Sequence, residues 1–328
     1  MTPQQKIMMR VKALLKERGK KALALAQQAV LEEKISYEPL QEALQYFMKE
    51  VWFDVLHPAL LSLACEAVGG NPDETTQVGA ALILLAGGAD VHDDIIDQSI
   101  TKGGKPTVFG KFGKDLTLLA GDALLFKGLY LLHDAIKLLP EAKMQRILDS
   151  VRQAFLGISA AEAKEAGWRG RTDISGQEYL DVIKMKVAVA EATTRIGAIL
   201  GNGSTNEVEM LSHYGRTFGI LNTVRDEYID VFEVDELKNR AGKEILPLPI
   251  LVAFQDSERK AEILRLLKEQ ITEDKLEKIL DLTLDSEENR KLTADMKMLV
   301  QQERRQISVL KSCQEELQLL LVTTLEDI

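Results

Sequence analysis

Residues 80–97 read AALILLAGGADVHDDIID, ten apolar or small residues followed at once by an acidic segment. On a helix, the aspartates of this segment fall at positions i, i+3, i+4 and i+7, so their carboxylates share one face about two turns long. They are Asp90, Asp93, Asp94 and Asp97. Like charges at this spacing repel one another, and the preceding apolar run is unlike a solvated surface helix. The pattern therefore predicts a positive partner at this face.

A hard divalent cation is the simplest such partner, because Mg2+ binds one or two carboxylates and completes its shell with water and phosphate oxygens. The alternative is an exposed acidic helix end. The loop that follows favours the metal site, since SITKGGKPTVFGK at 99–111 supplies Lys102, Lys105 and Lys111. These lysines are placed to meet an anion beside the metal, as phosphate chemistry requires.

Composition limits the classes of protein to consider. The chain has 328 residues, 45% hydrophobic and 28% charged, with a net charge of -10 and 5% aromatic residues. This balance is typical of a globular protein and lacks the basic surface of a nucleic-acid binder. Cys65 and Cys313 are far apart in apolar contexts, which favours buried thiols over a disulfide. Neither a membrane-spanning run nor a hydrophobic signal core is evident, so we expect a cytoplasmic protein.

Hydrophobic periodicity is helical almost everywhere, which predicts an all-α fold. Capping or first-turn residues stand at Pro72, Ser175, Thr205, Ser257, Thr272 and Ser286. Helices are expected over residues 1–33, 38–50, 56–68, 73–98, 115–137, 141–166, 176–201, 205–233, 247–254, 258–269, 273–283 and 287–325. No linker divides them, so we expect one domain over 1–328, with the N-terminal helix 1–33 and the C-terminal helices 258–328 packed on a 38–254 core.

A second acidic cluster lies at 225–230, which reads RDEYID. Asp226 and Asp230 are i, i+4 on a helix and Glu227 is adjacent, while the opposite face of that helix is an apolar stripe. Alone, such a cluster is more often a solvated face. Together with the first cluster, it is typical of two inward-facing carboxylate sets that hold metal ions and a diphosphate in a helical bundle.

Ordered motifs resemble those of the polyprenyl synthetase family, the trans-isoprenyl diphosphate synthases. HDDIID at 92–97 is similar to its first aspartate-rich motif, and RDEYID is similar to its second. The other matching stretches are GKPTVFGKFGKD at 104–115, LLAGDALL at 118–125, YLDVIKMKVA at 179–188 and AGKEILPLP at 241–249. The resemblance implies an antiparallel single-domain bundle around a deep central cavity, usually assembled as a homodimer.

The resemblance also implies a chemistry, in which three Mg2+ ions bridge both aspartate motifs to an allylic prenyl diphosphate. The diphosphate ionises, and isopentenyl diphosphate attacks the resulting carbocation. Carried over to this chain, the metal ligands would be Asp93, Asp94, Asp97, Asp226, Glu227 and Asp230, with Asp90 either joining them or capped by a nearby cation. The cations that bind the substrate diphosphate would be Lys102, Lys186, Lys243 and Arg240, and the catalytic set Lys186, Asp93, Asp94 and Asp226.

The expected acceptor pocket departs from the family pattern. FDVLHPALL at 53–61 places Asp54 and His57 where the family has a lysine and an arginine. Ala86, Gly103 and the pair Asn222-Thr223 replace three further anchors of isopentenyl diphosphate. A diphosphate without these partners loses several charge-assisted hydrogen bonds, each worth roughly 1.5–3 kcal/mol. Neutral His57 would be a weak substitute; other lysines such as Lys105 remain candidates.

Three interpretations follow. The first is a synthase that condenses an allylic diphosphate with isopentenyl diphosphate. The second is an enzyme that ionises the same substrate but uses another acceptor, as a cyclase or hydrolase does. The third is a weakly active subunit that supports a heteromeric partner. Small Gly88 and Ala89, before the first motif, predict an open tunnel and a product longer than three isoprene units, unless side chains of 116–132 close it.

Overall fold

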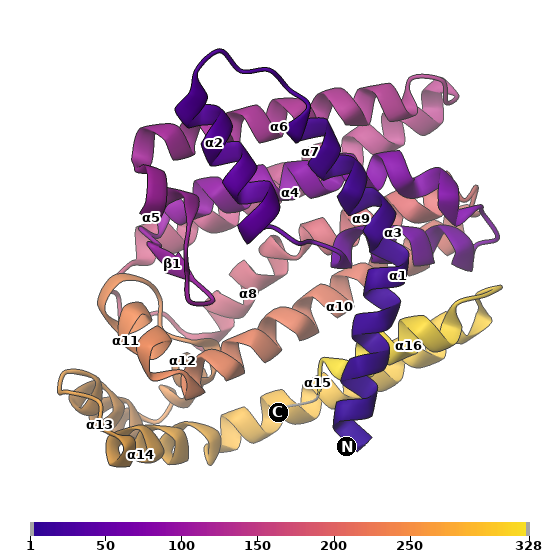
Figure 1. The fold of residues 1–328 in the computed structure, drawn as a ribbon. Coiled ribbons are helices and arrows are strands. Elements are labelled where there is room, and N and C mark those ends of the chain that lie inside the picture. Colours follow the sequence, from indigo (N-terminus) through magenta and orange to yellow (C-terminus); the bar gives the residue numbers. More distant parts are fainter. Residues whose placement is uncertain (1–2, 326–328) are drawn as a thin grey trace. The chain divides into compact units, whose positions relative to one another are not determined.

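The structure, a computed structural model, describes residues 3–325, and its elements are almost all helices (Figure 1). In chain order they are α1 Pro3–Leu31, α2 Glu38–Tyr46, the π-helical turn η1 Phe47–Val51, α3 Leu56–Ala67, the 3-10 turn η2 Pro72–Thr75, α4 Thr76–Ile96, β1 Thr101–Lys102, β2 Lys105–Pro106, α5 Val108–Phe112, α6 Lys114–Ile136, α7 Glu141–Trp168, α8 Gly176–Lys186, α9 Ala188–Leu200, α10 Thr205–Phe232, α11 Val234–Lys243, α12 Leu248–Ala253, α13 Ser257–Leu267, α14 Glu273–Leu284, α15 Glu287–Gln306, the 3-10 turn η3 Ile307–Val309 and α16 Gln314–Thr323. The predicted all-α class is confirmed.

These elements form two compact units, which we describe separately. The first comprises the residues up to Arg152 together with Ala192–Ser212 and Leu310–Glu316. The second comprises Gln153–Glu191, His213–Val309 and the residues from Leu317 onward. The expectation that the chain forms one domain stays a prediction.

In the first unit, α4 packs along α6 and against α1 and α3. Its N-terminal two-thirds is buried nearly all round, which explains why this stretch is apolar without amphipathic spacing. Leu84 and Val91 of α4 meet Leu124 of α6 and Phe47 of η1 in one core cluster. This packing fixes the end of α4, where the acidic segment begins.

In the second unit, the fully buried helix α12 contacts α8, α14 and α15. The Asn289 side chain, also buried, donates to the carbonyl oxygens of Pro249 at 2.8 Å and Thr283 at 2.9 Å, and its Oδ1 accepts from the Tyr228 hydroxyl at 3.0 Å. These bonds pair buried polar atoms of α10, α12, α14 and α15 with one another.

Local capping explains where several helices begin. Ser175 and Glu178 form a complete capping box at the start of α8, and Ser286 accepts from the Asn289 N–H at the start of α15. The caps of α10 and α13 are Ser204 and Asp256, each one residue before the position that the sequence indicated. The predicted cap at Thr2 lies outside the described residues.

The structure departs from the sequence-based assignment in several places, and the short helix α5 and the hairpin β1–β2 lie in a stretch that was predicted as a loop. The stretch predicted as helix over 176–201 is interrupted at Val187, and the one over 287–325 is interrupted by η3 and a turn in which Cys313 adopts a φ of +59°. Helix α11 was missed because its polar sequence, VDELKNRAGK, has only one fully buried apolar residue, Leu237, to reveal a core face. Both cysteines are free and buried, as expected.

Helix α6 has the predicted length, but it is the one described helix long and apolar enough to pass a test for a membrane span, which was not expected from the sequence. By length and composition it could cross a membrane, although a core helix of a globular domain passes the same test. One third of its most apolar window is buried in the structure. Its solvent-facing side carries a row of large apolar residues that includes Leu119, Phe126 and Tyr130.

Replacing Gly197 by alanine is expected to destabilise the protein by about 1–3 kcal/mol, because α9 and α3 approach too closely there for a side chain. A Cβ at Gly197 would stand 2.3 Å from the Leu61 carbonyl oxygen. Gly167→Ala on α7 is the matched control, since a Cβ there meets nothing within 4 Å and helix propensity alone should add up to about 1 kcal/mol. Urea unfolding followed by circular dichroism measures both variants. Equal midpoints would contradict the close packing of α9 on α3.

Candidate functional site

The first acidic cluster ends α4, and its positive partner within the first unit is Lys102. The Lys102 ammonium lies 2.8 Å from Asp90 Oδ1 and 3.0 Å from Asp94 Oδ1. Lys102 is thus a cation that caps Asp90, and the metal role of Asp90 stays a prediction. Lys102 was predicted to bind the substrate diphosphate; in the structure it bridges two aspartates, and its role toward a substrate stays a prediction.

Asp94 is the most buried member of this cluster, with 1% of its side chain exposed. Burial raises the pKa of Asp94 to about 6, with Lys102 acting against the shift and Asp90 and Asp93 adding to it. Its Oδ2 is buried and receives no hydrogen bond from the described residues. Such an oxygen costs free energy unless a cation approaches it.

The described acidic groups do not by themselves form a complete metal site. Within residues 3–325, no three histidine, cysteine, aspartate or glutamate side chains converge as a ready-made site. Mg2+ requires only one or two carboxylates and takes its remaining oxygens from water and diphosphate. The donors at the end of α4 are carboxylate oxygens, the type that a hard cation prefers.

A short hairpin carries Lys102 to the aspartates. Strands β1 and β2 pair antiparallel through a two-residue turn, in which Gly103 has a φ of +56° and Gly104 a φ of +76°. Both values are in the left-handed region that a type I′ turn requires and that glycine adopts readily. Gly103 therefore stands where the family has an arginine because this turn favours glycine there.

The other lysines of this loop already have partners. The Lys105 ammonium donates to the Glu50 carbonyl oxygen at 3.1 Å, and that of Lys111 lies 3.8 Å from the centre of the Tyr46 ring. Tyr46 in turn donates from its hydroxyl to the Pro106 carbonyl oxygen at 2.7 Å. These contacts tie the loop to α2 and η1, so the predicted acceptor role of Lys105 would require its release from Glu50.

Asp54 and His57 form a close pair at the start of α3. Asp54 Oδ1 accepts from the backbone N–H of Leu56 at 3.0 Å and of His57 at 3.1 Å, which caps the helix. Asp54 Oδ2 lies 2.8 Å from His57 Nδ1. Burial acts to lower the pKa of His57, but the Asp54 charge outweighs it and raises that pKa above its ordinary value, while the pKa of Asp54 is lowered. His57 is therefore a better cation than its residue type alone indicated.

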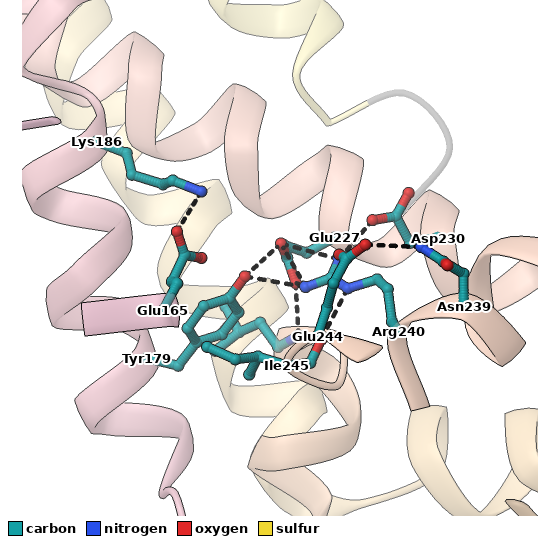
Figure 2. A network of polar contacts seen from close by, with 10 residues as sticks. Glu165, Tyr179, Lys186, Glu227, Asp230, Asn239, Arg240, Glu244 and Ile245 are labelled. Atoms are coloured by element: carbon teal, nitrogen blue, oxygen red, sulfur yellow. Dashed lines mark hydrogen bonds and ion pairs between the residues drawn. The ribbon is translucent and has the colours of Figure 1, made fainter. Parts of the chain in front are cut away.

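Of the three carboxylates in the second acidic cluster, two form ion pairs with Arg240 and the third is largely exposed. Figure 2 shows Glu227 and Asp230 of α10 pointing toward Arg240 of α11. Arg240 Nη2 lies 3.0 Å from Glu227 Oε2, and Nη1 lies 2.5 Å from Asp230 Oδ2. Asp226 instead keeps 56% of its side chain exposed and accepts from Asn222 Nδ2 at 3.0 Å. Partial burial, with neighbouring Asp230 and Glu227, raises the pKa of Asp226 to about 6, although Arg225 opposes this.

The two predicted substrate lysines of the second unit differ in their surroundings. Lys186, at the end of α8, pairs with Glu165 of α7 (Figure 2). Its ammonium also lies 3.1 Å from Oε1 of Glu162, on the same helix. Burial raises the pKa of Glu165, and Lys186 opposes that shift. Lys243 ends α11 and is exposed. The sequence analysis missed Glu162 and Glu165, because an acidic pair among alanines on a long helix resembles a solvated face.

The structure thus brings Asp90, Asp94 and Lys102 together in the first unit. In the second unit it brings together Glu227, Asp230 and Arg240, with Tyr179 as a member that sequence reasoning missed. The prediction that the two acidic clusters face one another across a cavity stays a prediction. At Gly88 a Cβ would stand 2.8 Å from Leu125 of α6, which fits the alternative that side chains of 116–132 close the tunnel; the product length stays a prediction.

Comparison with known proteins agrees with these features. The family model for polyprenyl synthetase matches residues 39–283, so the chain belongs to the polyprenyl synthetase family. A geranylgeranyl pyrophosphate synthetase from Pyrococcus horikoshii Ot3 superposes with a TM-score of 0.86 over 97% of this chain and 99% of that one, at 22% identity, which shows the fold.

Curated relatives are moderately similar in sequence. The short chain isoprenyl diphosphate synthase of Methanothermobacter thermautotrophicus is 33% identical over 55% of each chain, and the geranylgeranyl diphosphate synthase of Sulfolobus acidocaldarius is 34% identical over 53% of each. The chain therefore spans about half the length of these relatives. Geranylgeranyl pyrophosphate synthase 11 of Arabidopsis thaliana is 32% identical over 70% of this chain and 68% of its own.

Asp54→Asn is expected to lower the pKa of His57 while keeping the helix cap, because the amide oxygen still accepts from the backbone but carries no charge. Raising a histidine pKa on folding stabilises the protein fully below the unfolded value of about 6.5, and this contribution is lost as pH rises through the folded value. Hence the variant should lose stability mainly below neutral pH.

NMR titration of the His57 ring protons measures this pKa directly, and denaturant unfolding at pH 5.5 and pH 9 measures the stability. Asp54→Ala is the comparison variant, since it removes the cap as well and should cost about 1 kcal/mol more at both pH values. An unchanged His57 pKa in Asp54→Asn would show that the pair does not form in solution.

Proposed function

We propose that the protein is a Mg2+-dependent prenyltransferase that ionises an allylic prenyl diphosphate and condenses it with isopentenyl diphosphate to a longer trans-polyprenyl diphosphate. The observation that carries this proposal is buried Asp94, with an oxygen lacking a donor, in the HDDIID segment of a polyprenyl synthetase family member. The names of the relatives, which are isoprenyl and geranylgeranyl diphosphate synthases, support the same reaction class.

In this proposal, carboxylates hold the metal ions, and their number is proposed to be three with the diphosphate bound. Asp93 and Asp94 serve on α4 with Asp97 at its C-cap, and Asp226 serves on α10 with Asp230 beside it. When bound, Mg2+ neutralises the charge that grows on the leaving diphosphate. Lys102, Lys186 and Lys243 are proposed to add charge-assisted hydrogen bonds to the same leaving group. No protein nucleophile is required.

Two of the proposed substrate lysines, Lys102 and Lys186, already form ion pairs with acidic side chains, so a substrate diphosphate must replace those partners. Lys186 exchanges Glu162 and Glu165 for diphosphate oxygens, and Lys102 exchanges Asp90 and Asp94 in the same way. A metal ion that binds Asp94 removes the need for Lys102 at that carboxylate. We therefore propose that metal binding releases Lys102 toward the diphosphate, so that metal and substrate bind together.

A second candidate function is favoured by the state of the acceptor pocket. Gly103 offers no cation, and Lys105 and Lys111 are engaged by Glu50 and Tyr46. His57, which stands in sequence where the family has an arginine, is then the proposed cation of this pocket. If His57 alone does not hold isopentenyl diphosphate, the enzyme ionises a prenyl diphosphate and the resulting prenyl carbocation reacts with another acceptor or with water. A weakly active subunit of a heteromeric synthase is the third candidate.

Product analysis distinguishes these candidates. Purified protein with Mg2+ and prenyl diphosphates of several lengths is expected to give longer diphosphates only when isopentenyl diphosphate is present, as measured by mass spectrometry. Asp93→Ala and Asp94→Ala should each lower the rate on the order of 100-fold or more, because they remove charge stabilisation of the leaving group. Asp295→Asn, on an exposed face of α15, should retain full activity.

Each remaining outcome points to a different candidate. Diphosphate release with only alcohol or hydrocarbon products would overturn the synthase proposal in favour of another acceptor. Activity that appears only after a second chain is added would favour the heteromeric subunit. Full activity in Asp93→Ala and Asp94→Ala would disprove the metal assignment.

We also propose a homodimer, in the cytoplasm, assembled through the exposed face of α6. Phe126 is 74% exposed and Tyr130 63%, and Leu119 and Leu129 lie on the same side at helical spacing. A contiguous apolar face of this kind is typical of a protein interface. The usual homodimeric assembly of the family makes a second copy of the chain the proposed occupant.

Phe126→Glu is expected to convert the dimer into monomer, because a carboxylate would be buried without a partner at the centre of this face. Analytical ultracentrifugation measures the change. Val309→Glu is the matched control: its side chain is 72% exposed on η3, far from α6 in sequence, and the variant should remain dimeric. A dimeric Phe126→Glu protein would place the interface elsewhere.

A further inference from the structure

Glu227 differs from Asp226 and Asp230 of its motif because both of its carboxylate oxygens accept several hydrogen bonds from buried groups of the protein. Its side chain is buried and accepts from the Tyr179 hydroxyl at 2.9 Å and from the Leu248 backbone N–H at 2.8 Å. Both carboxylate oxygens also accept from Arg240, at 3.0 and 3.1 Å. Both oxygens therefore already have hydrogen-bond donors, whereas a carboxylate ready to bind a metal ion would have an oxygen without one.

The guanidinium of Arg240 likewise donates hydrogen bonds only to groups inside the protein. It is buried, and its Nε donates to the Ile245 carbonyl oxygen at 2.9 Å. Nη1 donates to Glu227 and Asp230, and Nη2 donates to Glu227 and to the Tyr179 hydroxyl at 2.9 Å. These bonds account for all five N–H groups of a guanidinium, so Arg240 has none to offer a substrate diphosphate without breaking a buried contact.

The network joins segments that are distant in sequence. Tyr179 belongs to α8, Glu227 to α10 and Arg240 to α11, and Leu248 is the first residue of α12 (Figure 2). The N-cap of α12 is Pro247, which has no side-chain hydrogen bond to offer. Glu227 supplies that cap, and its negative charge at a helix N-terminus is favourable.

The same network fixes where α11 ends. Arg240 bonds to Ile245 across the turn that follows α11, and Asn239 Nδ2 donates to Glu244 Oε1 at 2.6 Å in the same turn. Lys243 lies within this closed turn, exposed at its outer side. Asp226, next to Glu227, is likewise turned outward, with over half of its side chain exposed. The buried ion pair between Glu227 and Arg240 therefore fixes the backbone that carries the exposed side chains of Asp226 and Lys243.

We infer that Glu227 and Arg240 are positioning residues, and that neither is a metal or diphosphate ligand. Together with Tyr179 they fix α11 against α10, so that Lys243 and Asp226 are presented to the diphosphate and its metal. The inference rests on the proposed function for what Lys243 and Asp226 bind. Of the adjacent residues Asp226 and Glu227, only Asp226 is then a metal ligand.

The first test needs no activity. Arg240→Lys keeps the charge but loses the forked geometry, and we expect faster amide hydrogen exchange in α11 and the first turn of α12, with α4 unchanged. Tyr179→Phe, which removes one hydroxyl and keeps the ion pair, should give a smaller increase at the same amides and guards against misfolding of the first variant. Unchanged exchange in both variants would overturn the inference.

The second test separates positioning from direct binding. Arg240→Lys and Lys243→Ala should each raise the KM for the allylic diphosphate about tenfold, the size of one lost charge-assisted hydrogen bond. If Arg240 acts through Lys243, the double variant has the KM of Lys243→Ala alone. A KM that rises about 100-fold in the double variant would show that Arg240 contacts the substrate itself.

The third test concerns the metal. Isothermal titration with inorganic pyrophosphate in the presence of Mg2+ should show about tenfold weaker Mg2+-dependent binding in Asp226→Asn. Glu227→Gln, measured at saturating pyrophosphate, should keep the wild-type dependence on Mg2+ concentration. A weakened dependence in Glu227→Gln equal to that of Asp226→Asn would make Glu227 a ligand and overturn the inference. If no prenyl diphosphate is turned over, the proposed function fails, while the exchange and titration results still decide the role of Arg240.

Discussion

Compensation of buried negative charge within each unit is the constraint on which the rest of this structure depends. A carboxylate removed from water must gain a cation or several N–H donors, or else take up a proton. The helices supply such partners from positions distant in sequence. The resulting pairs are Lys102 with Asp90 and Asp94, Lys186 with Glu162 and Glu165, and Arg240 with Glu227 and Asp230. In each of the three groups two acids share one base, so negative charge remains in excess.

That excess connects the fold to its chemistry. An oxygen of Asp94 remains buried without a donor, and the pKa values of Asp94 and Asp226 are both raised to about 6. A protein optimised only for stability would replace such groups by apolar ones, since a buried ion pair seldom improves on good packing. Retaining them at the ends of well-packed helices is consistent with a site whose remaining positive charge arrives with the metal and whose bases then turn to the substrate.

The helices could be predicted from the sequence because most of them bury an apolar face and begin at a polar cap, and both features are local. Helix α11 could not, because it is held by Arg240, whose partners lie on α8 and α10 rather than in its own sequence. The same limit applies to the site. Asp93 and Asp94 follow from spacing, whereas the burial of Glu227 and its difference from Asp226 depend on Tyr179, which is 48 residues away. Sequence spacing identifies which acids share a face, and only packing decides which of them is already occupied.

The loss of the family's acceptor arginine at Gly103 also has a local structural reason. A two-residue hairpin with positive φ at both positions favours glycine, and this tight hairpin is what carries Lys102 back to Asp90 and Asp94. An arginine at 103 would add a cation but would strain the turn that carries Lys102 to Asp90 and Asp94. The cation nearest in role is then His57, whose charge depends on Asp54 rather than on its own chemistry. If His57 serves the acceptor as proposed, that side of the site is coupled to pH through one histidine–aspartate pair, whereas the proposed donor side is built from lysines.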